Sequence, residues 1–345
     1  MTMTAITPVD FAFVSAKLHG MRSKLYEAER IEPLTSLRST FEMAASVFPS
    51  LDVRSRTRFE RALVEVHVRD LVRVRTFLEG RNREFFDWQL ERYRVENLKV
   101  LLRGWKTKLP QSDIESLLVE LPTDYDLPVA DVLATDKIND VIHMMPRKAF
   151  AEGIRRGVIQ FHDSDKLYYI EAGLDAEYLK ELCVRARRLR MLDRRQVNAL
   201  LRMELLIYNI LFVMRARLNY DVPEQDIREF IVTGRGPAPE THKIVAVLQA
   251  DGFENMLAAL PDRKMLLGSA DDPHDIGELQ RGMWERLYLL ANRLFYRALF
   301  HMGCVEAFYT IKRVELQNLI RVAELLRQEK PSSEIQRELI RLPEA

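Results

Sequence analysis

Three stretches of the sequence repeat one pattern: ENLKVLLRGWKTKLPQSDIESLLVELP at residues 96–122, YNILFVMRARLNYDVPEQDIREFIVTG at 208–234 and QNLIRVAELLRQEKPSSEIQRELIRLP at 317–343. In each stretch an asparagine lies in an apolar helical segment, a proline follows 13 or 14 residues later, and an acidic residue and an isoleucine come next. The matched residues are Asn97, Asn209 and Asn318; Pro110, Pro223 and Pro331; and Ile114, Ile227 and Ile335. Because proline lacks a backbone N–H and clashes with the preceding turn, each proline should end a long helix and precede a short one.

The segments ahead of the three stretches match as well. A helical stretch ends near Gly80, Asp193 or Gly303, and the asparagine follows 15 to 17 residues later. The unit is therefore a long helix, a tight connection, a second long helix of more than twenty residues, a proline stop and a short helix. Three such helical hairpins predict an all-α fold of three similar domains, at residues 1–125, 126–236 and 237–345. The copies are 112 and 109 residues apart, whereas solenoids repeat every ~20–50 residues, so closed threefold packing is favoured over an open superhelix.

Two kinds of polar residue in the repeat have roles that helix chemistry suggests. An asparagine inside a helix costs a few tenths of a kcal/mol relative to alanine, so its recurrence predicts a specific hydrogen bond, to a loop carbonyl where hairpins meet. Ligand binding by the asparagines is the less favoured alternative. Ser112 and Ser333 directly precede an acidic residue, and they are candidate N-caps of the short helices.

The composition favours helix almost throughout. Only 13 glycines occur in 345 residues, and folds rich in strands and turns need more. The 52 Lys and Arg residues nearly balance 51 Asp and Glu residues, so no overall field draws the chain to nucleic acid or to an anionic membrane. The two cysteines, Cys183 and Cys304, form neither a disulfide framework nor a zinc motif.

No membrane-spanning segment is expected. The most apolar window is 203–214, and its uncharged core, residues 205–214, has ten residues where a span needs ~20. The N-terminal MTMTAITPVDF lacks the basic and apolar regions of a secretory signal.

The search for catalytic chemistry gives one weak candidate. The pair His162-Asp163 resembles the dipeptide of helical metal-dependent phosphohydrolases, and His143 lies 19 residues upstream. The pair sits in the polar stretch QFHDSDK, where a surface N-cap is the favoured interpretation over a metal site. No phosphate-binding loop, nucleophile elbow or dinucleotide fingerprint is present. The sequence therefore predicts no catalytic, cofactor-binding or metal-binding residue, and no cofactor.

The basic stretch RARRLRMLDRR at 185–195 has three possible explanations. Its six arginines and one aspartate are typical of a solvated helix C-terminus, where cations complement the helix dipole. Contact with an acidic partner is the second interpretation. Nucleic-acid binding is the third, and it is disfavoured because no aromatic stacking motif accompanies the arginines.

The chain resembles a known family in the order and spacing of several passages. DFAFV at 10–14 is similar to that family's aromatic N-terminal helix, and RVENLKVLLRG at 94–104 is similar to its Asn-Leu-…-Leu-Arg signature. EAGLDAEYLKEL at 171–182 and VEAFYTIKRVELQNLIRVAELL at 305–326 resemble two further helices. The family is that of the C subunits of bacterial and archaeal V/A-type rotary ATPases, which are equivalent to the d subunits of the eukaryotic vacuolar enzyme.

The resemblance implies a pseudo-threefold helical funnel and a noncatalytic central-stalk role. Such a protein docks on the membrane c-ring of proteolipid subunits, receives the central shaft made of the D and F subunits, and passes torque between them. It would be peripheral, at the cytoplasmic face of the membrane. The chain departs from the family in the loops TGRGPAP (233–239) and LGSADDP (267–273) and in Glu324, where the first two copies have arginine. The alternatives are a metal-dependent phosphohydrolase using His162 and Asp163, or a generic helical scaffold.

Overall fold

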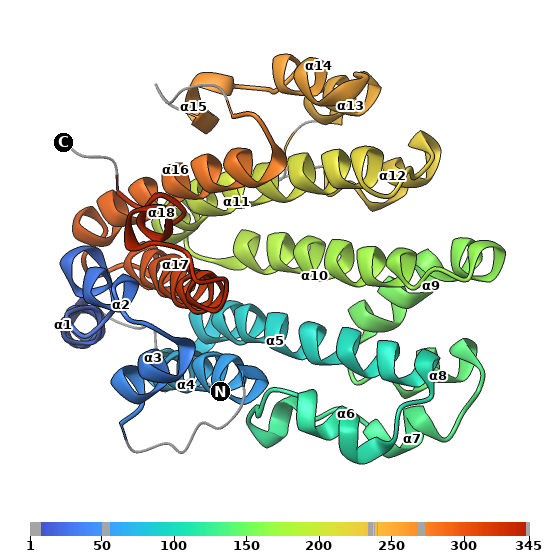
Figure 1. Cartoon of the computed structure of the whole chain (residues 1–345), viewed down its shortest axis with the longest axis horizontal. Helices are drawn as coiled ribbons and strands as arrows, with labels where there is room; N and C mark the ends of the chain where they lie inside the picture. The colour runs from blue at the N-terminus through green and yellow to red at the C-terminus, as the bar shows by residue number, and fades with distance from the viewer. Residues whose placement is uncertain are drawn as a thin grey trace. The chain divides into compact units, whose positions relative to one another are not determined.

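The computed structural model describes residues 8–49, 56–233, 237, 239, 241–267 and 273–342, and these residues form helices and no strand (Figure 1). This confirms the all-α prediction. The α-helices are α1 (Pro8–Arg22), α2 (Glu32–Thr35), α3 (Thr40–Val47), α4 (Arg56–Arg75), α5 (Gly80–Thr107), α6 (Gln111–Leu117), α7 (Val129–Leu133), α8 (Ile138–Met144), α9 (Lys148–Ser164), α10 (Tyr168–Arg188), α11 (Met191–Leu218), α12 (Glu224–Phe230), α13 (Thr241–Gln249), α14 (Gly252–Ala258), α15 (Arg263–Leu267), α16 (Ile276–Arg297), α17 (Met302–Arg327) and α18 (Ser332–Arg337). Two short 3-10 helices, η1 (Ala28–Arg30) and η2 (Thr123–Tyr125), complete the described elements.

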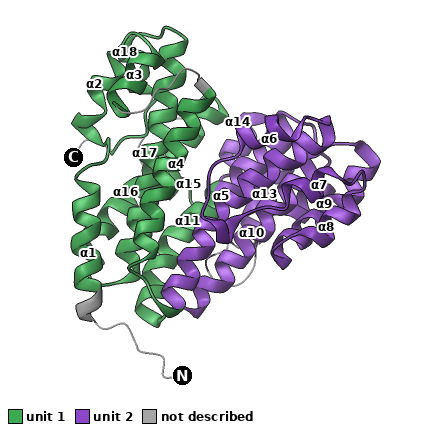
Figure 2. Cartoon of the chain, turned by 90° about the horizontal axis from the view of Figure 1, so that it is seen from below, with its two compact units in different colours: residues 1–80, 190–207, 261–345 green, residues 81–189, 208–260 purple. Residues whose placement is uncertain are grey.

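The chain divides into two compact units, which Figure 2 shows in different colours. Unit 1 comprises residues 1–80, 190–207 and 261–345, and unit 2 comprises residues 81–189 and 208–260. The division runs through α11, so neither unit is a continuous stretch of chain. The three domains at 1–125, 126–236 and 237–345 stay a prediction from the repeat.

The predicted order of helices occurs three times. Each copy contains a pair of long helices. These are α4 and α5, with 20 and 28 residues; α10 and α11, with 21 and 28 residues; and α16 and α17, with 22 and 26 residues. A short helix follows each pair directly after its proline: α6, α12 and α18. The breaks expected near Asp193 and Gly303 fall slightly earlier, because α10 ends at Arg188 and α16 at Arg297. Asp193 and Gly303 lie in the first turn of the next helix.

The second long helix of each copy ends in the same backbone conformation. Two residues before the proline, Lys108, Asp221 and Glu329 have φ of 54°, 48° and 56°, in the left-handed region. The next N–H then turns back to a carbonyl of the last helical turn: Leu109 N donates to Gly104 O at 3.0 Å, and Lys330 N donates to Leu325 O at 3.0 Å. This bond satisfies carbonyls that the helix end would otherwise leave open, although glycine is the usual residue at such a position.

The N-caps of the short helices differ from the expectation. Pro110, Pro223 and Pro331 are the N-cap residues, and none has a side chain that can cap. Ser112 lies inside α6, where its hydroxyl contacts Asp113 at 3.3 Å, and Ser333 lies inside α18. The serine caps were therefore wrong, because the helix begins directly after the proline, whose fixed φ suits the entry into a helix.

The three asparagines make the same pair of hydrogen bonds. Asn97 Nδ2 donates to Val119 O at 2.8 Å, and Val119 N donates to Asn97 Oδ1 at 2.9 Å. The same two bonds join Asn209 to Val232, at 2.8 and 2.9 Å, and Asn318 to Ile340, both at 2.9 Å. Each asparagine thus holds the chain beyond its short helix against the long helix. The prediction of a bond to a loop carbonyl is confirmed, and the backbone N–H adds a second bond. We call this arrangement the asparagine clamp.

Replacing Asn209 with alanine should lower the free energy of unfolding by about 2 kcal/mol, because the buried N–H and C=O of Val232 both lose their partner. Asn209 is fully buried. Urea denaturation followed by circular dichroism measures the change, and Asn139→Ala, at an exposed helix position, is the matched control. Equal midpoints for the two variants would contradict the role of the clamp.

Unit 2 contains a helix pair that depends on glycine. Gly153 and Gly157 on α9 face α10, where Gly173 lies. A Cβ atom built on Gly173 would lie 2.1 Å from the carbonyl oxygen of Gly153, and one on Gly157 would lie 2.3 Å from that of Tyr169. Real Cβ atoms do not approach backbone oxygens so closely, so only glycine permits this contact. Three of the few glycines in the chain are therefore used here.

Unit 1 is built around α17. This helix packs against α16, α4, α1, α2, α3 and α18. One apolar cluster joins the start of the chain to its end, and its members include Leu34 and Phe59 on one side and Leu319, Val322 and Ile335 on the other.

The isoleucine of the repeat is fully buried in all three copies, at Ile114, Ile227 and Ile335.

Candidate functional site

The structure does not support a metal site at the histidine–aspartate pair. His162 and Asp163 are exposed and lie in the last turn of α9, which ends at Ser164. No group of three or more His, Cys, Asp or Glu side chains placed to hold a metal ion occurs in the described part of the chain. The N-cap interpretation of the pair was also wrong. The buried Phe150, Ile154 and Phe161 continue the apolar face of α9 through this stretch, and Asp165, at φ 58°, ends the helix.

A buried ion pair joins equivalent positions of two repeats within unit 1. Arg313 Nη1 lies 2.5 Å from Glu204 Oε1, and the two side chains are 9% and 7% exposed. Each residue comes five positions before the asparagine of its own copy. The guanidinium also lies over the rings of Trp284 and Tyr309, 4.9 and 5.4 Å from the centroids. The ion pair therefore joins α11 to α17 through residues at equivalent positions of the second and third copies.

Two further networks of ion pairs lie at equivalent positions of the first and third copies, but the charges at these positions are reversed. In unit 2, Glu91 pairs with Arg94 at 3.3 Å and with Arg147 at 2.8 Å. In unit 1, Lys312 pairs with Glu315 and with Asp70, both at 2.8 Å. Glu91 and Lys312 lie six residues before their asparagines, and Arg94 and Glu315 lie three before. The second copy has Met203 and Leu206 at these positions, without charge.

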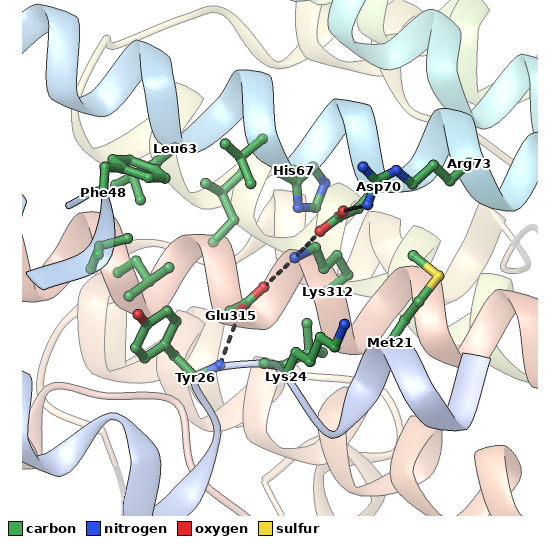
Figure 3. A pocket seen from close by; sticks show the side chains of 15 residues that line it. Met21, Lys24, Tyr26, Phe48, Leu63, His67, Asp70, Arg73, Lys312 and Glu315 are labelled. Atoms are coloured by element: carbon green, nitrogen blue, oxygen red, sulfur yellow. Dashed lines mark hydrogen bonds and ion pairs between the residues drawn. The ribbon is translucent and has the colours of Figure 1, made fainter. Parts of the chain in front are cut away.

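The network around Lys312 borders a cavity of about 200 Å³ (Figure 3). Figure 3 shows Asp70, Lys312 and Glu315 in a row, with Phe48 and Leu63 forming an apolar end. Glu315 Oε1 also accepts the backbone N–H of Tyr26 at 2.8 Å. Burial lowers the pKa of His67 well below its usual range, and the neighbouring Lys312 and Arg313 lower this pKa further. His67 is therefore neutral in the folded protein at neutral pH.

The depressed pKa of His67 makes stability depend on pH. The unfolded chain takes up a proton at this histidine below about pH 6.5, and the folded chain does not, so acid favours unfolding. We expect the free energy of unfolding to fall below pH 6.5 by up to about 1.4 kcal/mol per pH unit from this group. Urea denaturation of the wild type and of His67→Gln between pH 5 and 7.5 measures the slope. If the two slopes agree, His67 is not the group responsible.

The arginine stretch is a helix end that is partly paired. Arg185 Nη2 lies 3.1 Å from Glu181 Oε1, and its guanidinium lies over Trp88, 4.7 Å from the ring centroid. Arg187 and Arg188 are exposed in the last turn of α10, as the solvated-end interpretation predicts. The start of α11 exposes two apolar side chains, Met191 at 73% and Leu192 at 55%.

One described helix, α11, is long and apolar enough to span a membrane by length and composition. Of its most apolar window, 72% is buried inside the protein, as in the core helix of a folded domain. The same helix provides Glu204 to the ion pair and Asn209 to the clamp.

The three asparagine clamps and the three pairs of long helices define an all-helical protein that repeats one structural unit. A family model described as "ATP synthase (C/AC39) subunit" matches residues 14–338. The C subunit of the A-type ATP synthase of Methanosphaera stadtmanae is 22% identical over 270 residues, which cover 74% of this chain and 67% of that protein. The chain therefore belongs to the ATP synthase C/AC39 subunit family, and the resemblance in its motifs is confirmed. It is a noncatalytic stalk protein of the rotor of a V/A-type rotary ATPase, within a peripheral part of the complex.

The residues that the sequence analysis missed are those of the ion pairs. Glu204 and Arg313 are 109 residues apart, the spacing between Asn209 and Asn318. Aligning the copies on their asparagines places a charged residue at this register in every copy, because Arg92 is the equivalent in the first. This alignment of the three copies could have identified the charged residues of the ion pair from the sequence.

Proposed function

We propose that this chain is the noncatalytic central-stalk component that couples the shaft of a V/A-type ATPase to its membrane ring. In this role it docks on the proteolipid c-ring, receives the shaft made of the D and F subunits, and lies at the cytoplasmic face of the membrane. The family match over residues 14–338 is the observation that carries the proposal.

Stiffness is the physical property that this role requires. A protein that passes torque must not bend within its own helices, and helices with few interior glycines resist bending. The three asparagine clamps hold each chain reversal against its long helix, and buried ion pairs hold long helices to one another. The same features support a funnel of three domains, at 1–125, 126–236 and 237–345, about a pseudo-threefold axis. The contact of Glu204 with Arg313 favours such an axis, because the two residues are equivalent.

The test is affinity purification of the tagged full chain from detergent-solubilised membranes. We expect the c-ring, the shaft proteins and the nucleotide-binding proteins of the complex to be recovered with it, and an untagged strain provides the control. Purification of the chain alone, with metal-dependent phosphatase activity that His162→Ala abolishes, would overturn the proposal.

A further inference from the structure

A groove of about 600 Å³ lies within unit 2, beside the C-terminal ends of α5 and α9. Small-molecule sites in proteins typically have volumes of ~300–1,000 Å³, so this groove has the size of a ligand site. It is lined by Trp105, Lys106 and Lys108 from α5 and the residues after it, Phe161, His162 and Asp165 from the end of α9, and residues 136–139 at the start of α8. The comparisons with known proteins assign no function to it.

Two aromatic rings form the apolar part of the groove, and both are held in place. Their centroids lie 6.5 Å apart, with the ring planes at 44°. Trp105 Nε1 donates a hydrogen bond of 2.6 Å to Thr135 O, which fixes the indole. Phe161 is 8% exposed and lies beneath the ammonium group of Lys106, which is 5.0 Å from the ring centroid. Lys106 therefore covers a face of Phe161, and the half-buried indole of Trp105 is the aromatic surface against which a planar ring can pack.

Positive charge predominates at the rim. Lys106, Lys108 and Lys137 contribute three positive charges, and Asp136 and Asp165 contribute two negative ones. The pair of Lys108 with Asp136 spans 3.7 Å, and the two side chains are 82% and 92% exposed. Exposed ion pairs of this kind are weak, so Lys108 can turn toward a bound anion at little cost. Lys106 is held more firmly, because it binds both the carboxylate and the carbonyl oxygen of Asp165. Lys137 and His162 are exposed at the same rim.

We propose that this groove binds a nucleoside phosphate, with the base on Trp105 and the phosphates among the lysines. Stacking on aromatic rings is the general way in which proteins hold bases without reading them, and lysine is a common phosphate ligand. An uncharged aromatic molecule would use only the indole of Trp105, and inorganic phosphate would use only the lysines of the rim. This site would bind and would not hydrolyse its ligand, and it does not depend on the rotor role.

The experiment uses Trp105 as its own probe. The full chain is titrated with ATP, ADP, adenosine and inorganic tripolyphosphate while tryptophan fluorescence is recorded. We expect saturable quenching by ATP and ADP, and binding of adenosine and tripolyphosphate that is at least about tenfold weaker. The double variant Lys137→Gln/His162→Gln should raise the dissociation constant for ATP about tenfold, and Lys264→Gln, on α15 in the other unit, is the matched control.

A second variant separates binding from the optical signal. Trp105→Phe should remove the quenching while equilibrium dialysis still detects weakened ATP binding. The proposal fails if ATP gives no saturable change, or if the double variant binds ATP as tightly as the control. If adenosine binds as tightly as ATP, the groove is an apolar site only. If tripolyphosphate binds as tightly as ATP, the groove is an anion site only. Each of these results also overturns it.

Discussion

The variant Gly173→Ala should lose about 3 kcal/mol of its free energy of unfolding, although it adds only a methyl group. The new Cβ atom would lie 2.1 Å from the carbonyl oxygen of Gly153, an atom of the facing helix backbone. A flexible side chain could move aside, but backbone cannot, so α9 and α10 have to separate along their contact. Urea denaturation followed by circular dichroism measures the loss.

The same substitution elsewhere should have the opposite sign. Gly282 lies inside α16, and a Cβ atom there would meet only a leucine methyl group of Leu267, at 3.8 Å. Gly282→Ala should therefore stabilise the protein by about 0.5–1 kcal/mol, the ordinary gain from replacing glycine in a helix. If both variants shift the denaturation midpoint in one direction, helix propensity and not the close contact decides the outcome.

The variant Glu204→Leu should cost about 3–5 kcal/mol, the cost of removing one partner from a buried ion pair. The substitution removes the carboxylate that Arg313 Nη1 contacts at 2.5 Å and leaves the guanidinium buried without this counter-charge. Thermal and urea denaturation of the full chain measure the effect.

A double variant tests whether the loss comes from the pair itself. Glu204→Leu/Arg313→Met replaces both charges with apolar side chains of similar size, and such replacements are often neutral. We expect its stability to return to within about 1 kcal/mol of the wild type. Costs that simply add in the double variant would show that the two residues do not act on each other.

The repeat, the helix order and the clamp could be predicted because they depend on local chemistry. A proline stops a helix wherever it falls, and an asparagine that recurs in an apolar helix needs a partner. The starts of the first and third short helices, α6 and α18, were placed wrongly because the proline itself takes the cap position. His162 was assigned to a helix start because its polar neighbours suggested a loop, whereas the burial of Phe161 carries α9 past it.

Other features depend on which helices meet, and the sequence alone does not contain that information in a readable form. The contact of Gly153 with Gly173 follows from the approach of α9 to α10. The groove beside Trp105 joins segments that lie more than twenty residues apart along the chain. The sequence shows opposite charges at Glu91 and Lys312, but only the structure shows that they pair with Arg147 and Asp70, which come from other helices or loops.

That reversal has a consequence for how three similar segments reach their correct places. A chain with repeated helices risks exchanging one copy for another during folding, and such errors are a known failure of repeat proteins. Suppose that the second long helix of the first copy, α5, took the place of α17. Glu91 would then occupy the position of Lys312, and its carboxylate would face the carboxylate of Asp70. Its neighbour Arg94 would then stand where Glu315 accepts the N–H of Tyr26, a bond that arginine cannot accept. The uncharged second copy would leave Asp70 without this ammonium partner. The charge at this one buried position, negative at Glu91, positive at Lys312 and absent at Met203, thus distinguishes the three copies during folding.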